Sequence, residues 1–160
     1  RERISFYEKL CRSHGALLFE DYEEVRGWMD WLMDTLDSME HPKCLCHIDA
    51  NVDNFLFFED GSVKLLDWEY AGMCDPVMDV SMCAIYSYYN EEDMERLFRL
   101  YLQREPSEDE LFALYANAAL GGFLWCLWAV YKSILGDEFG EYTIIMYRYA
   151  KKYYRKLRKL

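Results

Sequence analysis

The sequence predicts a single, mostly α-helical domain of the α+β class, and three observations support this prediction. The chain has 160 residues, enough for one sizeable core, and 18% of them are aromatic, which argues against disorder. Apolar residues recur at helical spacing through most of its length. One short stretch, residues 55–66, instead shows two apolar runs around a turn, which is typical of a β-hairpin.

The first part of the chain is predicted to hold helices and one short strand. Its first residues have helical character, and residues 22–38 repeat apolar side chains at helical spacing from Val25 to Leu36. Pro42 ends this helix. Residues 44–47 are short and apolar enough for the end of a strand.

The second part is predicted to be entirely helical beyond the turn at Asp75-Pro76. Asn90 and Ser107 are the expected N-cap residues, and Ser107 with Glu110 forms a capping box. The helices are expected at about 78–89, 91–103, 108–135 and 141–159.

Polar side chains stand at both ends of the predicted hairpin. If residue 55 faces residue 66 across the turn 59–62, Asn54 and Asp67 lie side by side, with Asp49 just before the first strand and Glu69 just after the second. Taken singly, each residue is better explained as a strand cap or a turn former. Together they gather carboxylate and amide oxygens, which suit Mg²⁺ when phosphates supply the remaining ligands.

The charge distribution narrows the choice of partners. The net charge is −11, although the chain beyond residue 147 holds seven Lys and Arg and no acidic residue. The acidic body is a poor partner for nucleic acid and suits a cationic ligand or metal ions. The basic end is expected to be the solvated face of a terminal helix rather than a membrane-surface helix, because its tyrosines supply an apolar face to bury.

Residues 111–131 contain no charged residue and are long enough to cross a bilayer. Asn117 and two tryptophans near the middle instead favour the central helix of a folded domain, so no membrane span is predicted.

The six cysteines lack the spacing of a disulfide framework, and reduced thiols in a cytoplasmic protein fit best. Cys44, Cys46 and His47 lack the spacing of a zinc site.

Two segments resemble the choline/ethanolamine kinase family, a group similar to the aminoglycoside phosphotransferases with a protein-kinase-like fold. HIDANVDN at 47–54, the hairpin, and LLDWEYAG at 65–72 resemble its catalytic loop and metal-binding segment, H-x-D-x-x-x-x-N followed by [IL]-D-[WF]-E. GFLWCLWAVYKS at 122–133, followed by EFGEY, resembles the family's C-terminal signature.

The resemblance implies roles for the residues at the hairpin mouth. Asp49 would be the base that positions the substrate hydroxyl and accepts its proton. Asn54 and Asp67 would hold Mg²⁺ against the phosphates of ATP, and Glu69 would reach a second ion.

Two further residues are implied as structural supports of the site. His47 would brace the catalytic loop. Asp79, in the segment DPVMDVS at 75–81 that resembles the family's next turn and helix start, would hold backbone groups of that loop.

Trp125 and Trp128 are three positions apart and share a helical face. A quaternary ammonium cannot donate N–H hydrogen bonds, and each aromatic ring attracts it by about 0.5–2 kcal/mol. Taken alone, the two rings are better explained as core residues; with the resemblance, they are predicted to bind choline. Tyr86 and Tyr89 are predicted as further walls of the substrate site.

The resemblance implies that residues 1–160 form the C-terminal, substrate-binding and catalytic lobe of a choline kinase. No GxGxxG loop and no strand with a nucleotide-clamping Lys precede the motif, so the N-terminal nucleotide lobe is expected to lie outside this chain. The expected reaction transfers the γ-phosphoryl group of ATP to choline and gives phosphocholine. This lobe alone is expected to be inactive and to self-associate through its uncovered face.

The sequence leaves other functions open. A phosphotransferase for aminoglycosides or another small molecule would want acidic walls rather than a tryptophan pair. A non-catalytic module that binds quaternary ammonium compounds would have no use for Asp49, Asn54 and Asp67. Choline and ethanolamine are not distinguished by sequence alone.

Overall fold

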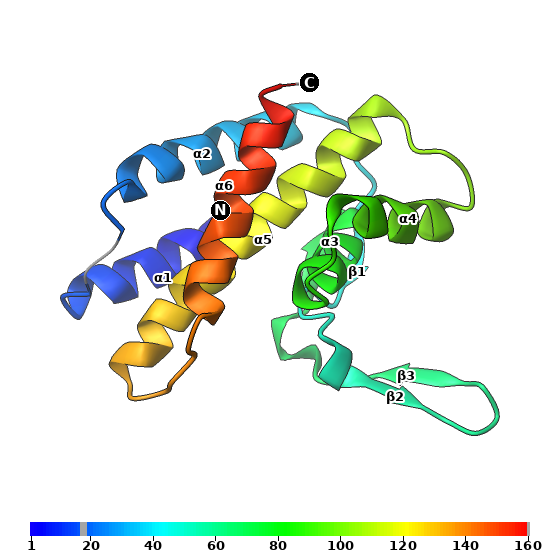
Figure 1. Ribbon diagram of the computed structural model, residues 1–160, viewed down its shortest axis with the longest axis horizontal. Helices are drawn as coiled ribbons and strands as arrows, with labels where there is room; N and C mark the ends of the chain where they lie inside the picture. Colours follow the sequence, from blue (N-terminus) through cyan, green and yellow to red (C-terminus); the bar gives the residue numbers. More distant parts are fainter. Residues whose placement is uncertain (17–18, 160) are drawn as a thin grey trace. The chain divides into compact units, whose positions relative to one another are not determined.

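The computed structural model describes residues 1–16 and 19–159, and the elements found there are predominantly α-helical (Figure 1). The chain divides into two compact units. We call Arg1–Met39 together with Ala118–Leu160 the helical unit, and Glu40–Asn117 the loop unit. Helix α5, Glu108–Ile134, contributes residues to both.

The helical unit contains α1 (Glu2–Ser13), α2 (Tyr22–Ser38), the second part of α5, and α6 (Tyr142–Leu157). The predicted helix 22–38 is confirmed, and the predicted helix 141–159 is confirmed with slightly shorter ends. The core of this unit combines aliphatic and aromatic side chains, including Val25, Met29, Leu32, Phe123, Leu127, Met146 and Tyr153.

Helices α5 and α6 approach each other closely at Gly122. A Cβ added at this position would lie 2.7 Å from the carbonyl oxygen of Met146 and 3.0 Å from the Cβ of Tyr149. Real carbon atoms do not approach this closely, so only glycine allows the two helix backbones to pack here.

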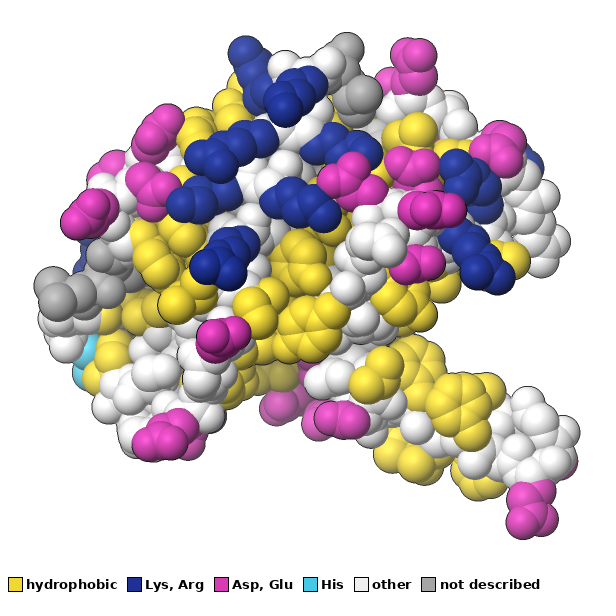
Figure 2. Space-filling view, viewed as in Figure 1, with side chains coloured by type: hydrophobic (Ala, Val, Ile, Leu, Met, Phe, Trp, Pro, Cys, Tyr) yellow, Lys and Arg dark blue, Asp and Glu magenta, His cyan; other side chains and the backbone are white. Residues whose placement is uncertain are grey.

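The basic end of the chain lies on α6, whose buried residues are Met146, Tyr147, Ala150, Tyr153 and Leu157. The Lys and Arg side chains of this helix gather on the outer surface, as Figure 2 shows over the C-terminal helix. The prediction of a solvated face on a terminal helix is confirmed, because the tyrosines provide the apolar face.

The loop unit contains two pairs of short antiparallel strands, followed by helices α3 (Val77–Tyr86) and α4 (Glu91–Leu102). Strand β1 (Cys44–Cys46) pairs with β4 (Gly72–Cys74), and β2 (Phe55–Phe57) pairs with β3 (Val63–Leu65). Strand β4 was not predicted from the sequence. Its pairing with β1 brings the residues directly before the segment 47–54 next to the end of the segment 65–72.

The register of the hairpin differs by one residue from the predicted register. Phe55 faces Leu65 rather than residue 66, because the loop closes between Phe58 and Ser62, whose backbone N–H and C=O groups are 3.0 Å apart. Gly61 has a φ of +82° and gives the left-handed residue that ends a three-residue hairpin loop. The predicted four-residue turn is therefore wrong, and Asn54 faces residue 66 instead of Asp67.

Capping residues set most helix boundaries where the sequence predicted them. The side chain of Asn90 accepts a hydrogen bond from the backbone N–H of Asp93 at 2.9 Å. Ser107 and Glu110 form the predicted capping box, with distances of 2.8 and 3.2 Å. Helix α3 ends three residues earlier than predicted, because Tyr88 takes a left-handed conformation with φ +54° and turns the chain.

Helix α5 meets the length and apolarity criteria for crossing a bilayer, with a mean hydropathy of 1.5 in its most apolar window. However, 78% of that window is buried inside the protein. This burial favours the interpretation of α5 as a core helix.

Candidate active site

The backbone of the segment 47–54 is held by the carboxylate of Asp79, which lies in the first turn of α3. Its Oδ2 accepts a hydrogen bond from the N–H of His47 at 2.9 Å, and its Oδ1 accepts one from the N–H of Ile48 at 2.7 Å. Ile48 has a φ of +71°, an uncommon conformation for a β-branched residue. The two hydrogen bonds therefore help to hold a strained turn directly before Asp49.

His47 links this loop to the segment that follows the hairpin. Its side chain is fully buried, and Nε2 lies 2.5 Å from the carbonyl oxygen of Leu66. Since a carbonyl can only accept, Nε2 carries the proton in this contact. The imidazole ring also packs edge-on against the indole of Trp68, with 4.9 Å between the ring centroids. His47 thus connects the two motifs through one hydrogen bond and one ring contact.

The half-buried carboxylate of Asp49 has a hydrogen-bond donor on each oxygen. The hydroxyl of Tyr86 donates to Oδ1 at 2.6 Å. The side-chain amide of Asn54 donates to Oδ2 at 3.2 Å and to the backbone carbonyl of Asp49 at 2.9 Å. Asp49 and Asn54 are therefore in direct contact, and their orientations depend on each other.

Asn54 and Asp67 approach through the backbone at the mouth of the hairpin. The N–H of Leu66 donates to the carbonyl oxygen of Asn54 at 2.8 Å, and Asp67 is the next residue. Asp67 takes a left-handed conformation, with φ 60° and ψ 66°, and precedes the short 3-10 helix Trp68–Tyr70 that contains Glu69. Both acidic residues are exposed.

The side-chain oxygens at the hairpin mouth suit a metal ion whose remaining ligands come from a bound substrate. Within residues 1–16 and 19–159, no group of three or more His, Cys, Asp and Glu side chains is arranged to hold a metal ion. The hairpin mouth provides the carboxylates of Asp67 and Glu69 and the amide oxygen of Asn54. Mg²⁺ needs only one or two protein carboxylates where phosphates complete its shell, whereas a protein-only metal site needs more ligands.

The predicted tryptophan pair belongs to an aromatic cluster of the helical unit, formed by Trp125, Trp128, Phe139 and Tyr142. The Trp128 ring lies 5.4 Å from that of Trp125 and 5.1 Å from that of Phe139, and Tyr142 lies 6.1 Å from Phe139. Trp125 is only 3% exposed, while Trp128 is partly accessible. Phe139 was missed as a site residue, although it stands in the segment EFGEY that carries part of the family resemblance.

A cation already lies near one of these rings. The Nζ of Lys132 is 5.8 Å from the centroid of Trp128 and 3.7 Å from the Oδ2 of Asp137. Cation–π attraction acts within about 6 Å of a ring centroid. The ammonium of Lys132 therefore lies within cation–π range of one ring of the cluster, that of Trp128.

The two predicted tyrosines lie in different surroundings. Tyr86 is the last residue of α3 and directs its hydroxyl to Asp49. Tyr89 lies beyond the left-handed turn at Tyr88 and is 38% exposed. The structure thus places one of them, Tyr86, in contact with another predicted site residue.

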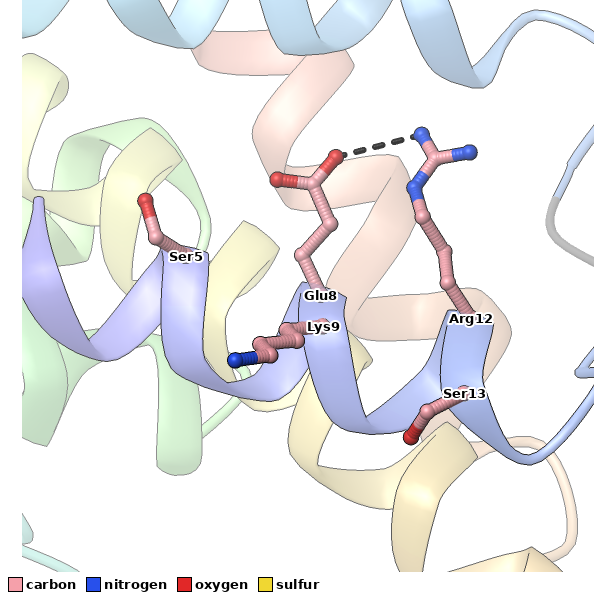
Figure 3. A pocket seen from close by; sticks show the side chains of 5 residues that line it. All are labelled: Ser5, Glu8, Lys9, Arg12 and Ser13. Carbon is pink, nitrogen blue, oxygen red and sulfur yellow. Dashed lines mark hydrogen bonds and ion pairs between the residues drawn. The ribbon is translucent and has the colours of Figure 1, made fainter.

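A separate, open hollow lies along α1 in the helical unit, lined by Ser5, Glu8, Lys9, Arg12 and Ser13 (Figure 3). Glu8 and Arg12 form an ion pair of 3.2 Å across one side of it. None of the predicted site residues lines this hollow, and its paired charges are those of a solvated helix face.

The chain belongs to the phosphotransferase enzyme family, whose model matches residues 5–112. This confirms the resemblance suggested by the segments 47–54 and 65–72, both of which lie within the matched residues.

The chain is also similar to parts of two curated proteins. The chain is 27% identical to "Protein LicA" of Haemophilus influenzae over 105 residues, which is 62% of this chain and 39% of that protein. It is 26% identical to "Ethanolamine kinase 1" of Mus musculus over 151 residues, 77% of this chain and 42% of that one.

Among solved structures, the choline kinase LicA from Streptococcus pneumoniae superposes with a TM-score of 0.83 at 29% identity, covering 97% of this chain and 54% of that chain. A second LicA structure, in complex with AMP, gives a TM-score of 0.82 at the same identity, covering 97% of this chain and 53% of that chain. The fold is therefore the protein-kinase-like fold of the choline kinases, as predicted. The chain spans about half the length of the solved relatives and about two fifths of the length of these two curated ones.

Proposed function

We propose that this chain is the C-terminal, substrate-binding and catalytic lobe of an ATP-dependent kinase that phosphorylates the hydroxyl group of choline. The family and the choline kinase LicA support a small-molecule kinase, and the LicA complex with AMP supports a nucleotide as the co-substrate. The chain's length, about half that of LicA, fits one lobe of a two-lobed enzyme. The nucleotide lobe would then belong to another part of the protein.

The observation that carries the proposal is the fixed carboxylate of Asp49. Its backbone turn is held by Asp79, and its two oxygens are oriented by Tyr86 and Asn54. A general base must be positioned before it can accept a proton efficiently. In the proposed reaction Asp49 orients the substrate hydroxyl and accepts its proton as the hydroxyl oxygen bonds to the γ-phosphorus of ATP, while the bond from that phosphorus to the leaving ADP breaks.

Asn54 and Asp67 are assigned to Mg²⁺, with Glu69 as the residue that reaches a second ion. When bound with the nucleotide, Mg²⁺ neutralises the phosphate oxygens between which charge moves during transfer. The protein's own contribution is to hold these side chains at the hairpin mouth, where the hydrogen bond between residues 66 and 54 fixes the backbone.

The aromatic cluster is assigned to the cationic head of the substrate. The ammonium of Lys132 lies within cation–π range of the Trp128 ring, which supports this assignment. Trp128 offers the accessible ring, and the buried Trp125 packs against it and keeps it in place. Tyr86 and Tyr89 remain predicted walls of the substrate site.

Ethanolamine is the second candidate substrate, because the mouse relative is named an ethanolamine kinase. Its primary ammonium can donate hydrogen bonds, whereas choline depends on ring faces. The Trp128–Phe139 pair therefore favours choline. A cytoplasmic location remains a prediction.

Self-association of this lobe also remains a prediction. The hairpin supports it, since Phe57 is 77% exposed and Leu56, Phe58 and Val63 are each more than 40% exposed. Figure 2 shows apolar side chains along the hairpin formed by β2 and β3. Exposed apolar surface of this kind favours contact with another protein surface.

The test is product formation by the full-length protein with ATP and Mg²⁺. Choline, ethanolamine and an aminoglycoside are supplied separately, ADP release is followed by a coupled assay, and phosphocholine is identified by ³¹P NMR. We expect the highest kcat/KM with choline, and no turnover when EDTA removes the metal. Preferred phosphorylation of the aminoglycoside would contradict the assignment, and so would ADP release without a phosphorylated amino alcohol.

A further inference from the structure

Helix α3 directs two side chains at the loop that carries Asp49. Asp79 and Tyr86 are seven positions apart, which is close to two helical turns, so they stand on the same face of the helix. Asp79 binds the backbone of residues 47 and 48, and Tyr86 binds the side chain of Asp49. One helix thus positions both the main chain of the loop and its carboxylate.

We infer that Tyr86 is a positioning residue whose hydroxyl fixes the Asp49 carboxylate for proton transfer. This inference rests on the proposed role of Asp49 as the base. The hydroxyl oxygen lies 2.6 Å from Oδ1, within the range of a charge-assisted O–H···O⁻ hydrogen bond. Such hydrogen bonds are roughly twice as strong as those between neutral groups.

The geometry at the carboxylate explains why a second donor matters. The terminal torsion of an aspartate is broad, so a carboxylate held at one oxygen can still rotate. Asn54 holds Oδ2 at a longer distance of 3.2 Å, and Tyr86 holds Oδ1. Because a carboxylate offers about four lone-pair positions, each oxygen keeps one for the substrate hydroxyl. With the hydrogen bond from Tyr86 in place, the carboxylate cannot rotate, so the lone pairs left for the substrate hydroxyl keep a fixed direction.

This role differs from that of an aromatic wall of the substrate site. A wall acts through its ring, which phenylalanine retains. A positioning residue acts through its hydroxyl, which phenylalanine lacks. Tyr86→Phe therefore separates the two, and it removes a single oxygen atom from a partly buried side chain.

The experiment measures kcat and KM of the full-length protein, with ATP, Mg²⁺ and choline, for the wild type and Tyr86→Phe. The matched control is Tyr115→Phe, because the hydroxyl of Tyr115 also donates to a carboxylate, that of Glu95, at 2.5 Å in the same unit. We expect Tyr86→Phe to lower kcat about tenfold while the KM for choline changes less than about twofold. Tyr115→Phe should lower the unfolding temperature and leave kcat within about twofold of the wild type.

The outcomes distinguish this inference from the proposed function. Loss of turnover in Asp49→Asn with a wild-type kcat in Tyr86→Phe would overturn the positioning role alone. Wild-type turnover in Asp49→Asn would overturn the assignment of the base and the inference with it. A raised KM with an unchanged kcat in Tyr86→Phe would show that the hydroxyl binds the substrate, and would also overturn the positioning role. Thermal unfolding of each variant sets the assay temperature, so that every rate is measured on folded protein.

Discussion

The carboxylate of Asp79 accepts a hydrogen bond from the backbone N–H of Ile48 at 2.7 Å, although the residues are 31 positions apart. Ile48 has a left-handed backbone, and a second N–H, that of His47, is bound by the same carboxylate. Two donors that would otherwise lack a partner are thereby satisfied at the turn that leads to Asp49. The chemistry proposed for the loop depends on this helix-to-loop contact.

Asp79→Asn should disturb the loop, because an amide offers one acceptor oxygen and turns its NH₂ group toward the second backbone donor. We expect a loss of about 1–3 kcal/mol in the free energy of unfolding, measured by urea denaturation. Faster hydrogen exchange of the amides of His47 and Ile48 should accompany it. Unchanged exchange at both amides would show that the carboxylate does not hold the turn.

Glu110→Gln should weaken the start of α5 in a pH-dependent way. Hydrogen bonds from Arg104 and from the backbone of Ser107 lower the pKa of Glu110 from 4.5 to about 2. The stabilisation is therefore fully present above pH 4.5 and is lost as the pH falls toward 2. Since Glu110 is partly exposed, we expect a difference of about 1 kcal/mol at pH 7 that disappears near pH 2.

Asp109→Asn is the matched control for this prediction, because the neighbouring carboxylate is exposed and in the same helical turn. Its effect on the free energy of unfolding should stay within about 0.5 kcal/mol. Urea denaturation at pH 7, 4 and 2.5 measures both variants. A Glu110→Gln effect that is constant over this range would show that the ion pair contributes nothing.

Gly122→Ala and Gly27→Ala make a pair with opposite expected effects. At Gly122 the new methyl group meets the backbone of α6 at 2.7 Å, so the helices must separate, which costs about 1–3 kcal/mol. At Gly27, in the exposed part of α2, no atom lies within 4 Å, and alanine should stabilise the helix by about 0.5–1 kcal/mol. Thermal unfolding of both variants measures the effects; equal shifts would contradict the close approach at Gly122.

Trp128→Ala should raise the KM for choline more than the KM for ethanolamine. The lost ring provides cation–π attraction of about 0.5–2 kcal/mol, and a primary ammonium can replace part of it with hydrogen bonds. Steady-state kinetics with both substrates measure the ratio. Trp31→Ala, in α2 of the same unit, is the control for loss of a packed indole and should leave that ratio unchanged. Equal losses for both substrates in Trp128→Ala would indicate a packing role instead.

Local signals predicted the elements of this fold well, whereas long-range pairings decided the details. The caps at Asn90 and Ser107 involve residues only three positions apart, so the sequence reveals them directly. The hairpin register differs by one residue from the predicted one, because the left-handed Gly61 closes a three-residue loop. The register is set by this turn geometry, which the apolar pattern does not reveal. The pairing of β1 with β4 joins three-residue strands that no periodicity can reveal.

In the candidate site, too, local spacing was predictable from the sequence and long-range contacts were not. The spacing of Asp49, Asn54 and Asp67 around the hairpin predicted that these residues would gather. The hydrogen bond from Tyr86 to Asp49 spans 37 positions and depends on how α3 meets the loop. Periodicity indicates which face of a helix is apolar, and it does not indicate which loop that face will meet.

The most direct test of the account compares Asp49→Asn with Asp53→Asn in the full-length protein. Both substitutions remove one negative charge from the same loop, but Asp53 is exposed and lies outside the hydrogen-bonded group around residue 49. Measured as phosphocholine formed from choline and ATP, Asp49→Asn should lose at least about 100-fold in kcat, while Asp53→Asn stays within about twofold of the wild type. Comparable turnover in the two variants would contradict the assignment of Asp49 as the catalytic base.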